Sequence, residues 1–442
     1  MGHWLAVGHQ PANRGQYYIV VCARVTATSC VPTLQRARAA HCGFRWLVVA
    51  ALLIAWGFCP HTRLAAQATA RQRYEEIARS FRDMAEKPPP ASLLPVEPAW
   101  SIRLGSSVST AAVMDETHVY VALREHTLVA LHRETGIIAW TWAGDTVLSM
   151  AIGGGELFLV TTGGLRALDA ATGYHRWTMP IDARTTAPVV WERGWIILAV
   201  ESGDLLGVRA NDGQLVWRQP LGATMTHPPG FGGEGALYVS LSDGRLVALT
   251  IDMGARLWER TLPGMLGAPA ATRDRVFVGS TNNFFYALHA GTGRDEWRWR
   301  NGGDVIGAAV DDEMVYFASL DNILRAVNRG NGNQRWRKPT GTRPVLPPLA
   351  FRGVVVVPGL MPAVTVFVGA TGAVMGTHPA TGDLAGPPLV DTAVKPFRVS
   401  LVTVTREGVV EAFRPAGLMF RETAAAPITA LPGRGLARER IE

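Results

Sequence analysis

Residues 167–177 read ALDAATGYHRW, and versions of this block recur through most of the chain. Each copy ends in tryptophan, and six such tryptophans follow one another at nearly even spacing from Trp140 to Trp336. A glycine stands at the fourth position before each of these tryptophans, and a small residue stands at the tenth. A fixed period of about forty residues indicates a repeat architecture built from one supersecondary unit.

The repeat extends beyond these six copies, but it loses its regularity at both ends. Trp100 lies one further period before Trp140, and the seventh internal unit keeps Thr371 and Gly372 but has Gly376 where tryptophan is expected. The repeat tryptophans are Trp100, Trp140, Trp177, Trp217, Trp258, Trp297 and Trp336. The turn glycines are Gly136, Gly173, Gly213, Gly254, Gly293, Gly332 and Gly372.

Short apolar runs lie upstream of each block, for example residues 157–160 and 354–357, and most are followed by a Gly, Asn, Asp or Ser turn. Such runs joined by such turns predict β-hairpins. Each unit is interpreted as strand, turn, strand, Thr-Gly turn and a strand ending in tryptophan, with a further short strand leading into the next unit. Four short strands in each repeat are typical of a propeller blade.

An eighth unit has strand-like runs at residues 401–404 and 409–412 but no closing block. We expect residues 97–104, around Trp100, to supply its missing outer strand. The predicted fold is therefore all-β: an eight-bladed β-propeller of four-stranded antiparallel blades, closed by N- and C-terminal strands, with a short N-terminal helix. The large tryptophan ring would fill the gap to the next blade, so we interpret the repeat residues as structural.

Residues 1–68 read as a leader. Arginines precede an apolar run at residues 46–58, which is short for a spanning helix and suits the core of a signal peptide. We predict a signal peptide over about residues 34–68 with cleavage after Ala68, and export to the periplasm or cell envelope. An uncleaved signal anchor and lipidation at Cys59 are the alternatives; bulky Phe58 argues against the second.

The next segment, residues 69–96, combines an amphipathic helix with a proline-rich linker. Its apolar positions recur at spacings of three and four, and they form a possible partner-binding face: Tyr74, Ile77, Phe81 and Met84. Docking of that face on the chain's own propeller is the simpler interpretation. The propeller is predicted over residues 97–415, followed by a C-terminal tail, 416–442, whose role the sequence leaves open.

Charge gives no argument for nucleic acid as a partner. The formal net charge is +7, but residues 1–68 contain six arginines and no acidic residue, so that the remainder carries about +1. All four cysteines also lie in the leader, the last of them at Cys59, and the eleven histidines show no metal-ligand spacing. We expect no metal site, and membrane association only through the leader or a partner.

The pattern Ala-x-Asp-x-x-Thr-Gly-x-x-x-Trp resembles the tryptophan-docking repeat of quinoprotein (PQQ) alcohol dehydrogenases. The same repeat occurs in PQQ-like propellers without known cofactor, among them the envelope family of the outer-membrane assembly factor BamB. The resemblance covers about residues 97–415 and implies the fold, whereas catalytic and non-catalytic members share the repeat. The dehydrogenases stack a disulfide of adjacent cysteines on their cofactor, and residues 60–442 contain no cysteine.

These observations favour the BamB-like, non-catalytic branch. We expect an envelope scaffold or protein-interaction propeller, with envelope proteins and the β-barrel assembly machinery as partners, no catalytic residues and no cofactor. The alternative is an exported PQQ-dependent oxidoreductase or a propeller that binds a small ligand.

Overall fold

The computed structural model describes residues 93–341, 343–344, 346–359, 363–391 and 398–416. All of them belong to one compact unit, Pro88–Glu442. The predicted leader, the predicted helix with Tyr74, Ile77, Phe81 and Met84, and the tail from residue 417 lie outside the described residues. Within those residues, no helix is both long and apolar enough to cross a membrane.

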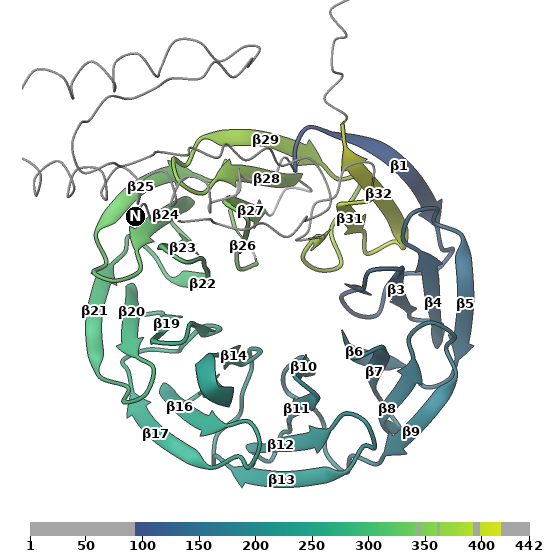
Figure 1. Ribbon diagram of the computed structural model, residues 1–442, viewed down its shortest axis with the longest axis horizontal. Helices are drawn as coiled ribbons and strands as arrows, with labels where there is room; N and C mark the ends of the chain where they lie inside the picture. The colour runs from purple at the N-terminus through teal and green to yellow at the C-terminus, as the bar shows by residue number, and fades with distance from the viewer. Residues whose placement is uncertain (1–92, 342, 345, 360–362, 392–397, 417–442) are drawn as a thin grey trace, which may run out of the picture. The chain divides into compact units, whose positions relative to one another are not determined.

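The described residues form eight four-stranded antiparallel sheets, which are the blades of a propeller (Figure 1). Blade 1 comprises β2 (Val113–Met114), β3 (His118–Leu123), β4 (Thr127–His132) and β5 (Ile138–Ala143). Blade 2 comprises β6 (Val147–Gly153), β7 (Glu156–Thr161), β8 (Gly164–Asp169) and β9 (His175–Met179). Blade 3 comprises β10 (Val190–Glu192), β11 (Trp195–Ala199), β12 (Asp204–Arg209) and β13 (Leu215–Pro220).

The next three blades repeat this pattern. Blade 4 comprises β14 (Gly230–Phe231), β15 (Ala236–Ser240), β16 (Arg245–Thr250) and β17 (Arg256–Thr261), with a short 3-10 turn, η1 (Gly233–Gly235), between its first two strands. Blade 5 comprises β18 (Ala270–Ala271), β19 (Arg275–Gly279), β20 (Phe284–His289) and β21 (Asp295–Arg300). Blade 6 comprises β22 (Val305–Val310), β23 (Met314–Ser319), β24 (Ile323–Asn328) and β25 (Gln334–Pro339).

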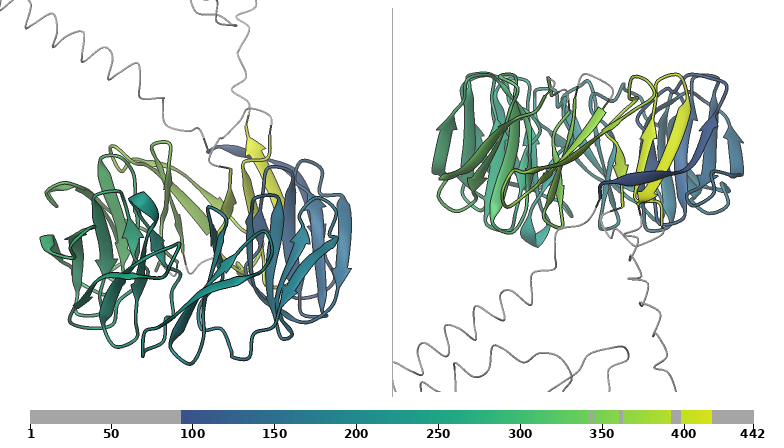
Figure 2. Two further views of the ribbon diagram at one scale, coloured as in Figure 1. Left: turned by 60° about the horizontal axis from the view of Figure 1, so that its bottom comes forward. Right: turned by 90° about the horizontal axis from the view of Figure 1, so that it is seen from above.

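The last two blades close the ring. Blade 7 comprises β26 (Leu349–Phe351), β27 (Val354–Pro358), β28 (Ala363–Val368) and β29 (Val374–Pro379). Blade 8 comprises β30 (Leu389–Val390), β31 (Leu401–Val404), β32 (Val409–Pro415) and β1 (Val96–Arg103). β1 pairs with β32 from Val96↔Pro415 to Arg103↔Val409, and Figure 2 shows the two strands side by side. The predicted eight-bladed propeller, closed by strands from both ends, is therefore confirmed.

The core lies between blades rather than within them. Each of eight buried apolar clusters joins two neighbouring blades; one, for example, combines Ile197 of blade 3 with Leu237 of blade 4. Second strands such as β3 and β23 are buried along their whole length because a blade covers each of their faces. Burial alternates along the outer strands instead, since successive side chains point to opposite faces of the sheet and only one of these faces is covered there.

Candidate functional site

The repeat tryptophans lie within the outer strands, near the start of the strand in most blades, so the interpretation of a strand ending in tryptophan is wrong in this detail. Each tryptophan pairs across the ladder with the small residue of its own repeat, as Trp140 does with Ala130 and Trp217 with Gly207. A Cβ atom on Gly207 would lie 2.0 Å from the Trp217 ring, which explains why this repeat has glycine where the others have alanine.

The turn glycine, by contrast, meets the tryptophan of the preceding blade. Trp140 of blade 1 lies against Gly173 of blade 2, and Trp217 of blade 3 lies against Gly254 of blade 4. A Cβ atom on Gly254 would lie 2.5 Å from that ring, and its φ of +63° is a conformation that favours glycine. The indole Nε1 of Trp217 also donates to the Ile251 carbonyl at 2.9 Å, in the same turn.

The same arrangement joins seven successive pairs of blades in the described chain. The indole nitrogen donates over 2.7–3.1 Å to a carbonyl at the third position before the turn glycine of the next blade. The acceptors, in chain order, are Arg133, Ala170, Ala210, Ile251, Ala290, Arg329 and Gly369. These contacts hold neighbouring blades together, and the indole nitrogens are fully used in them.

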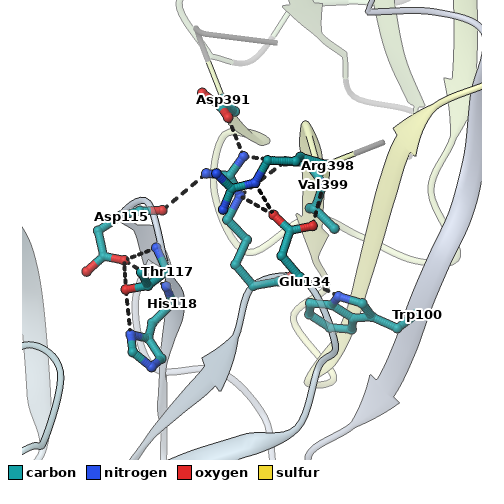
Figure 3. A network of polar contacts seen from close by, with 9 residues as sticks. Trp100, Asp115, Thr117, His118, Glu134, Asp391, Arg398 and Val399 are labelled. Carbon is teal, nitrogen blue, oxygen red and sulfur yellow. Dashed lines mark hydrogen bonds and ion pairs between the residues drawn. The ribbon is translucent and has the colours of Figure 1, made fainter. Parts of the chain in front are cut away.

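A polar network spans the junction of blades 8 and 1 (Figure 3). Arg133 is 3% exposed, and its guanidinium pairs with Asp391 and donates to the Val399 carbonyl, with Nε at 3.1 Å. Glu134 accepts from Arg398 Nε at 3.1 Å and from the Val399 amide at 3.0 Å. The network ties the turn after β4 to the segment before β31. Sequence reasoning missed it because Arg133 and its acceptor Val399 stand 266 positions apart in the chain.

Next to this network, Asp115 organises the turn between β2 and β3. Its Oδ1 accepts from the amides of Thr117 and His118, each at 2.7 Å, and its Oδ2 accepts from the Tyr120 hydroxyl at 2.7 Å. Burial acts to raise the pKa of Asp115, but these hydrogen bonds outweigh it and the pKa is lowered overall. Burial also lowers the pKa of His118. The carboxylate is therefore committed to holding a turn rather than to acid–base chemistry.

The described residues hold no group of three His, Cys, Asp or Glu side chains placed to bind a metal ion. Two surface clefts of about 530 and 540 Å³ are present. One is lined by Arg103, Glu407 and Glu411 of blade 8 with the loop after β29, and the other by Ile181–Thr185 and neighbouring residues of blades 2 and 3. Neither is lined by a cysteine or a histidine.

The exposed large apolar side chains follow the rim formed by the turns between third and outer strands, here called the outer-turn rim. Eight of the ten found in the described chain lie there or at the adjoining start of the outer strand. They belong to blades 1 to 4 and blade 7: Ile137, Ile138, Tyr174, Leu215, Val216, Met253, Leu257 and Val374. Tyr174 is 76% exposed and follows directly on the turn glycine. Blades 5 and 6 have Arg294 and Asn333 at this position.

Exposed apolar groups along this rim on four consecutive blades form an arc. Contiguous apolar exposure marks protein–protein or membrane interaction sites. The outer-turn rim of blades 1–4 is therefore the candidate interaction surface. The sequence contained a signal for it in blades 1 and 2 alone, where Ile137 and Tyr174 follow the turn glycine; blade 3 has Gln214 at this position.

Comparison with known proteins adds a family. The family model described as outer membrane protein assembly factor BamB matches residues 96–200, 161–266 and 242–388. A curated relative of that name from Nitrosomonas eutropha is 27% identical over 187 residues, which cover 39% of this chain and 44% of the relative. One from Yersinia pestis is 27% identical over 201 residues, covering 41% and 50%. The alignments thus span about half the length of these relatives.

Solved structures agree in fold. The crystal structure of BamB from Moraxella catarrhalis superposes with a TM-score of 0.58 at 21% identity, covering 72% of this chain and all of that one. A quinohemoprotein alcohol dehydrogenase from Pseudomonas putida HK5 superposes with a TM-score of 0.55 at 13% identity, covering 78% of each chain. Similarity at these identities establishes the propeller alone, which both kinds of protein share.

Proposed function

Because the chain belongs to the family of the outer membrane protein assembly factor BamB, we propose that it is a non-catalytic scaffold propeller of the bacterial envelope that assists β-barrel assembly. The family match over residues 96–388 is the observation that carries this proposal. The described geometry is compatible with it, because the repeat residues serve packing between blades and an apolar arc remains exposed for a partner.

The outer-turn rim of blades 1–4 would be the surface that contacts the partner. Tyr174 and Met253 are well suited to this, since aromatic residues and methionine are enriched in the cores of protein interfaces. Tyr174 and Met253 are 76% and 66% exposed, and each would lose most of its contact with water in a complex.

Affinity capture from envelope extracts, with the chain as bait, tests the proposal. Recovery of β-barrel assembly components is the expected result, and recovery of the bait alone would contradict it. The double variant Ile137→Glu/Tyr174→Glu should abolish that recovery. The matched control, Asn333→Glu/Ala373→Glu, places glutamate after the turn glycines of blades 6 and 7 and should leave it unchanged.

The oxidoreductase alternative has its own test. Incubation with PQQ and calcium should give neither a stoichiometric cofactor absorbance band nor dye-linked alcohol oxidation. Turnover under these conditions would overturn the assignment as a non-catalytic protein.

A further inference from the structure

The outer strands of blades 5 and 6 carry an unusual concentration of positive charge. On β21 and β25, together with the turn residue before β21, six cationic side chains lie on neighbouring blades, and five are exposed. This set is here called the basic wall: Arg294, Arg298, Arg300, Arg335, Arg337 and Lys338. In contrast, β5 of blade 1 contains no charged residue, and β29 of blade 7 contains only His378 as a titratable group.

Arginines on the outer strands of blades 2, 3 and 4 are neutralised by carboxylates. Arg176 on β9 pairs with Asp169 at 2.5 Å, and Arg218 on β13 donates through Nε to Asp204 at 2.7 Å. On β17, Arg256 pairs with Glu259 at 2.6 Å. A paired arginine on an edge strand adds little net field, because its charge is cancelled within a few ångströms.

The basic wall lacks such partners within the described residues. Blade 5 does have two acidic residues on β21, but each pairs with an arginine outside the wall. Asp295 accepts from Arg260 at 2.9 Å, and Glu296 lies 3.5 Å from Arg275. Within the described part of the chain, the wall makes one cation–π contact: the Cζ of Arg298 lies 5.5 Å from the centre of the Phe284 ring. The six charges therefore add up on one side of the ring.

The shape of the wall indicates what it can bind. Its residues lie on β21, on β25 and in the turn before β21, and both strands run along the outer edge of the ring (Figure 1). Neither of the two clefts described above is lined by a residue of these strands. None of the exposed large apolar residues of the described chain lies on these strands either. The residues that dominate protein interfaces lie in well-packed, fully desolvated pockets. Adsorption to an anionic membrane requires only accumulated charge.

We propose that the basic wall binds the anionic headgroups of a phospholipid membrane. Guanidinium groups donate two parallel hydrogen bonds to a phosphate, and clusters of four to eight Lys and Arg residues are of the size that recognises anionic lipid. The propeller would thus contact a bilayer through blades 5 and 6 while the outer-turn rim of blades 1–4 stays free. This membrane contact depends neither on the leader nor on the proposed function, so that its test can succeed or fail independently of both.

Vesicle co-sedimentation of the full chain tests the proposal, with the difference between two lipid mixtures as the readout. Vesicles containing phosphatidylglycerol should bind the chain, vesicles of pure phosphatidylcholine should bind it much less, and rising salt should abolish the difference. Taking the difference in binding between the two lipid mixtures subtracts any membrane insertion of the leader that does not depend on lipid charge. The variant Arg298→Gln/Arg335→Gln should bind about 25-fold more weakly, at roughly fivefold for each arginine.

The chain offers a matched control, Arg176→Gln/Arg218→Gln. These two arginines flank their repeat tryptophans in the same way, on blades 2 and 3, and the control changes the net charge by the same amount. It should keep at least half of the wild-type affinity, because its arginines are already paired. Equal losses in both variants, equal binding to both lipids, or displacement by polyglutamate more readily than by phosphatidylglycerol would each overturn the proposal. Unchanged thermal unfolding of both variants ensures that the comparison concerns folded protein.

Discussion

Seven junctions between blades resemble one another, and the junction between blades 7 and 8 does not. At the seven, a tryptophan on one outer strand packs on the turn glycine of the next blade. At the eighth, Gly376 takes the place of the tryptophan and Leu94 fills the space, with its Cδ1 3.1 Å from the position of a Cβ on Gly376. Leu94 is 6% exposed and belongs to the apolar cluster between these two blades.

The difference follows from how the ring is closed. In blade 8 the third strand, β32, and the outer strand, β1, come from opposite ends of the chain. No Thr-Gly turn can connect them, so a tryptophan in blade 7 would have no turn glycine to pack against. The comparison teaches that each tryptophan depends on the turn of the next repeat rather than on its own.

The largest effect is expected from Trp217→Ala, at a regular junction. The ring is 8% exposed, and its removal leaves a cavity between blades 3 and 4 and an unpaired Ile251 carbonyl. The free energy of unfolding should fall by about 3–5 kcal/mol. Denaturant unfolding measures this, with Arg218→Ala at the next, exposed position as control. A loss of unfolding free energy below about 1 kcal/mol would contradict the structural role predicted for the repeat tryptophans.

The next largest effect is expected from Arg133→Met, which tests the polar network at the junction of blades 8 and 1. The substitution removes the buried partner of Asp391 and the donors to Val399, and it should cost about 3 kcal/mol. Arg329→Met is the matched control at the same repeat position in blade 6, where the side chain is less buried and its ion pair to Asp274 is 3.7 Å long. Equal losses of unfolding free energy in the two variants would mean that Arg133 stabilises its junction no more than Arg329 stabilises a regular one.

Leu94→Ala should destabilise the fold by about 2–3 kcal/mol, because it empties the space that the ring of a tryptophan fills elsewhere. Thermal unfolding of this variant beside Leu104→Ala, a half-buried leucine just after β1, gives the measurement. An equally small loss in both variants would show that the segment before β1 does not seal this junction.

Gly376→Trp places the tryptophan of the regular junctions at the irregular junction between blades 7 and 8. The ring would face Val366, where regular repeats have Ala or Gly, and would meet Leu94. Overpacking should cost about 1–3 kcal/mol. Adding Val366→Ala and Leu94→Ala should recover part of that loss in denaturant unfolding; a Gly376→Trp variant more stable than wild type would contradict the account of closure.

The smallest effect concerns pH at the same junction. The His378 ring lies 4.1 Å from that of Phe413, and its Nε2 is buried without a hydrogen-bond partner in the described structure. Burial lowers the pKa of His378 in the folded state below its ordinary value of 6.5. The unfolded chain therefore takes up the proton first, and stability should decline as pH falls below about 6.5.

His378→Phe should make that decline shallower without abolishing it, because burial also lowers the pKa of His118 and His227. Thermal unfolding across this pH range provides the check. An unchanged slope would show that His378 is not held neutral at the junction.

The amino-acid sequence by itself determined the blades. Period-two strands, Gly and Asp turns and the regular spacing of tryptophans are local patterns, and they sufficed to predict eight four-stranded blades and the use of β1 as the last outer strand. The predictions for residues 1–92 and for the tail lie outside the described residues and stay predictions.

The tertiary structure alone decided which repeats touch. Gly173 and Trp177 stand close together in one repeat, yet Gly173 packs on Trp140 and Trp177 on Gly213. Likewise, only the fold showed that Leu94 occupies the site of the missing tryptophan and that Arg133 is buried against Val399. It also showed that, among the described residues, the arginines of β21 and β25 have no carboxylate partner of the kind that neutralises Arg176 and Arg218. The physical reason is that a repeat pattern specifies each unit's own hydrogen bonds, whereas the partners of its side chains lie on neighbouring units.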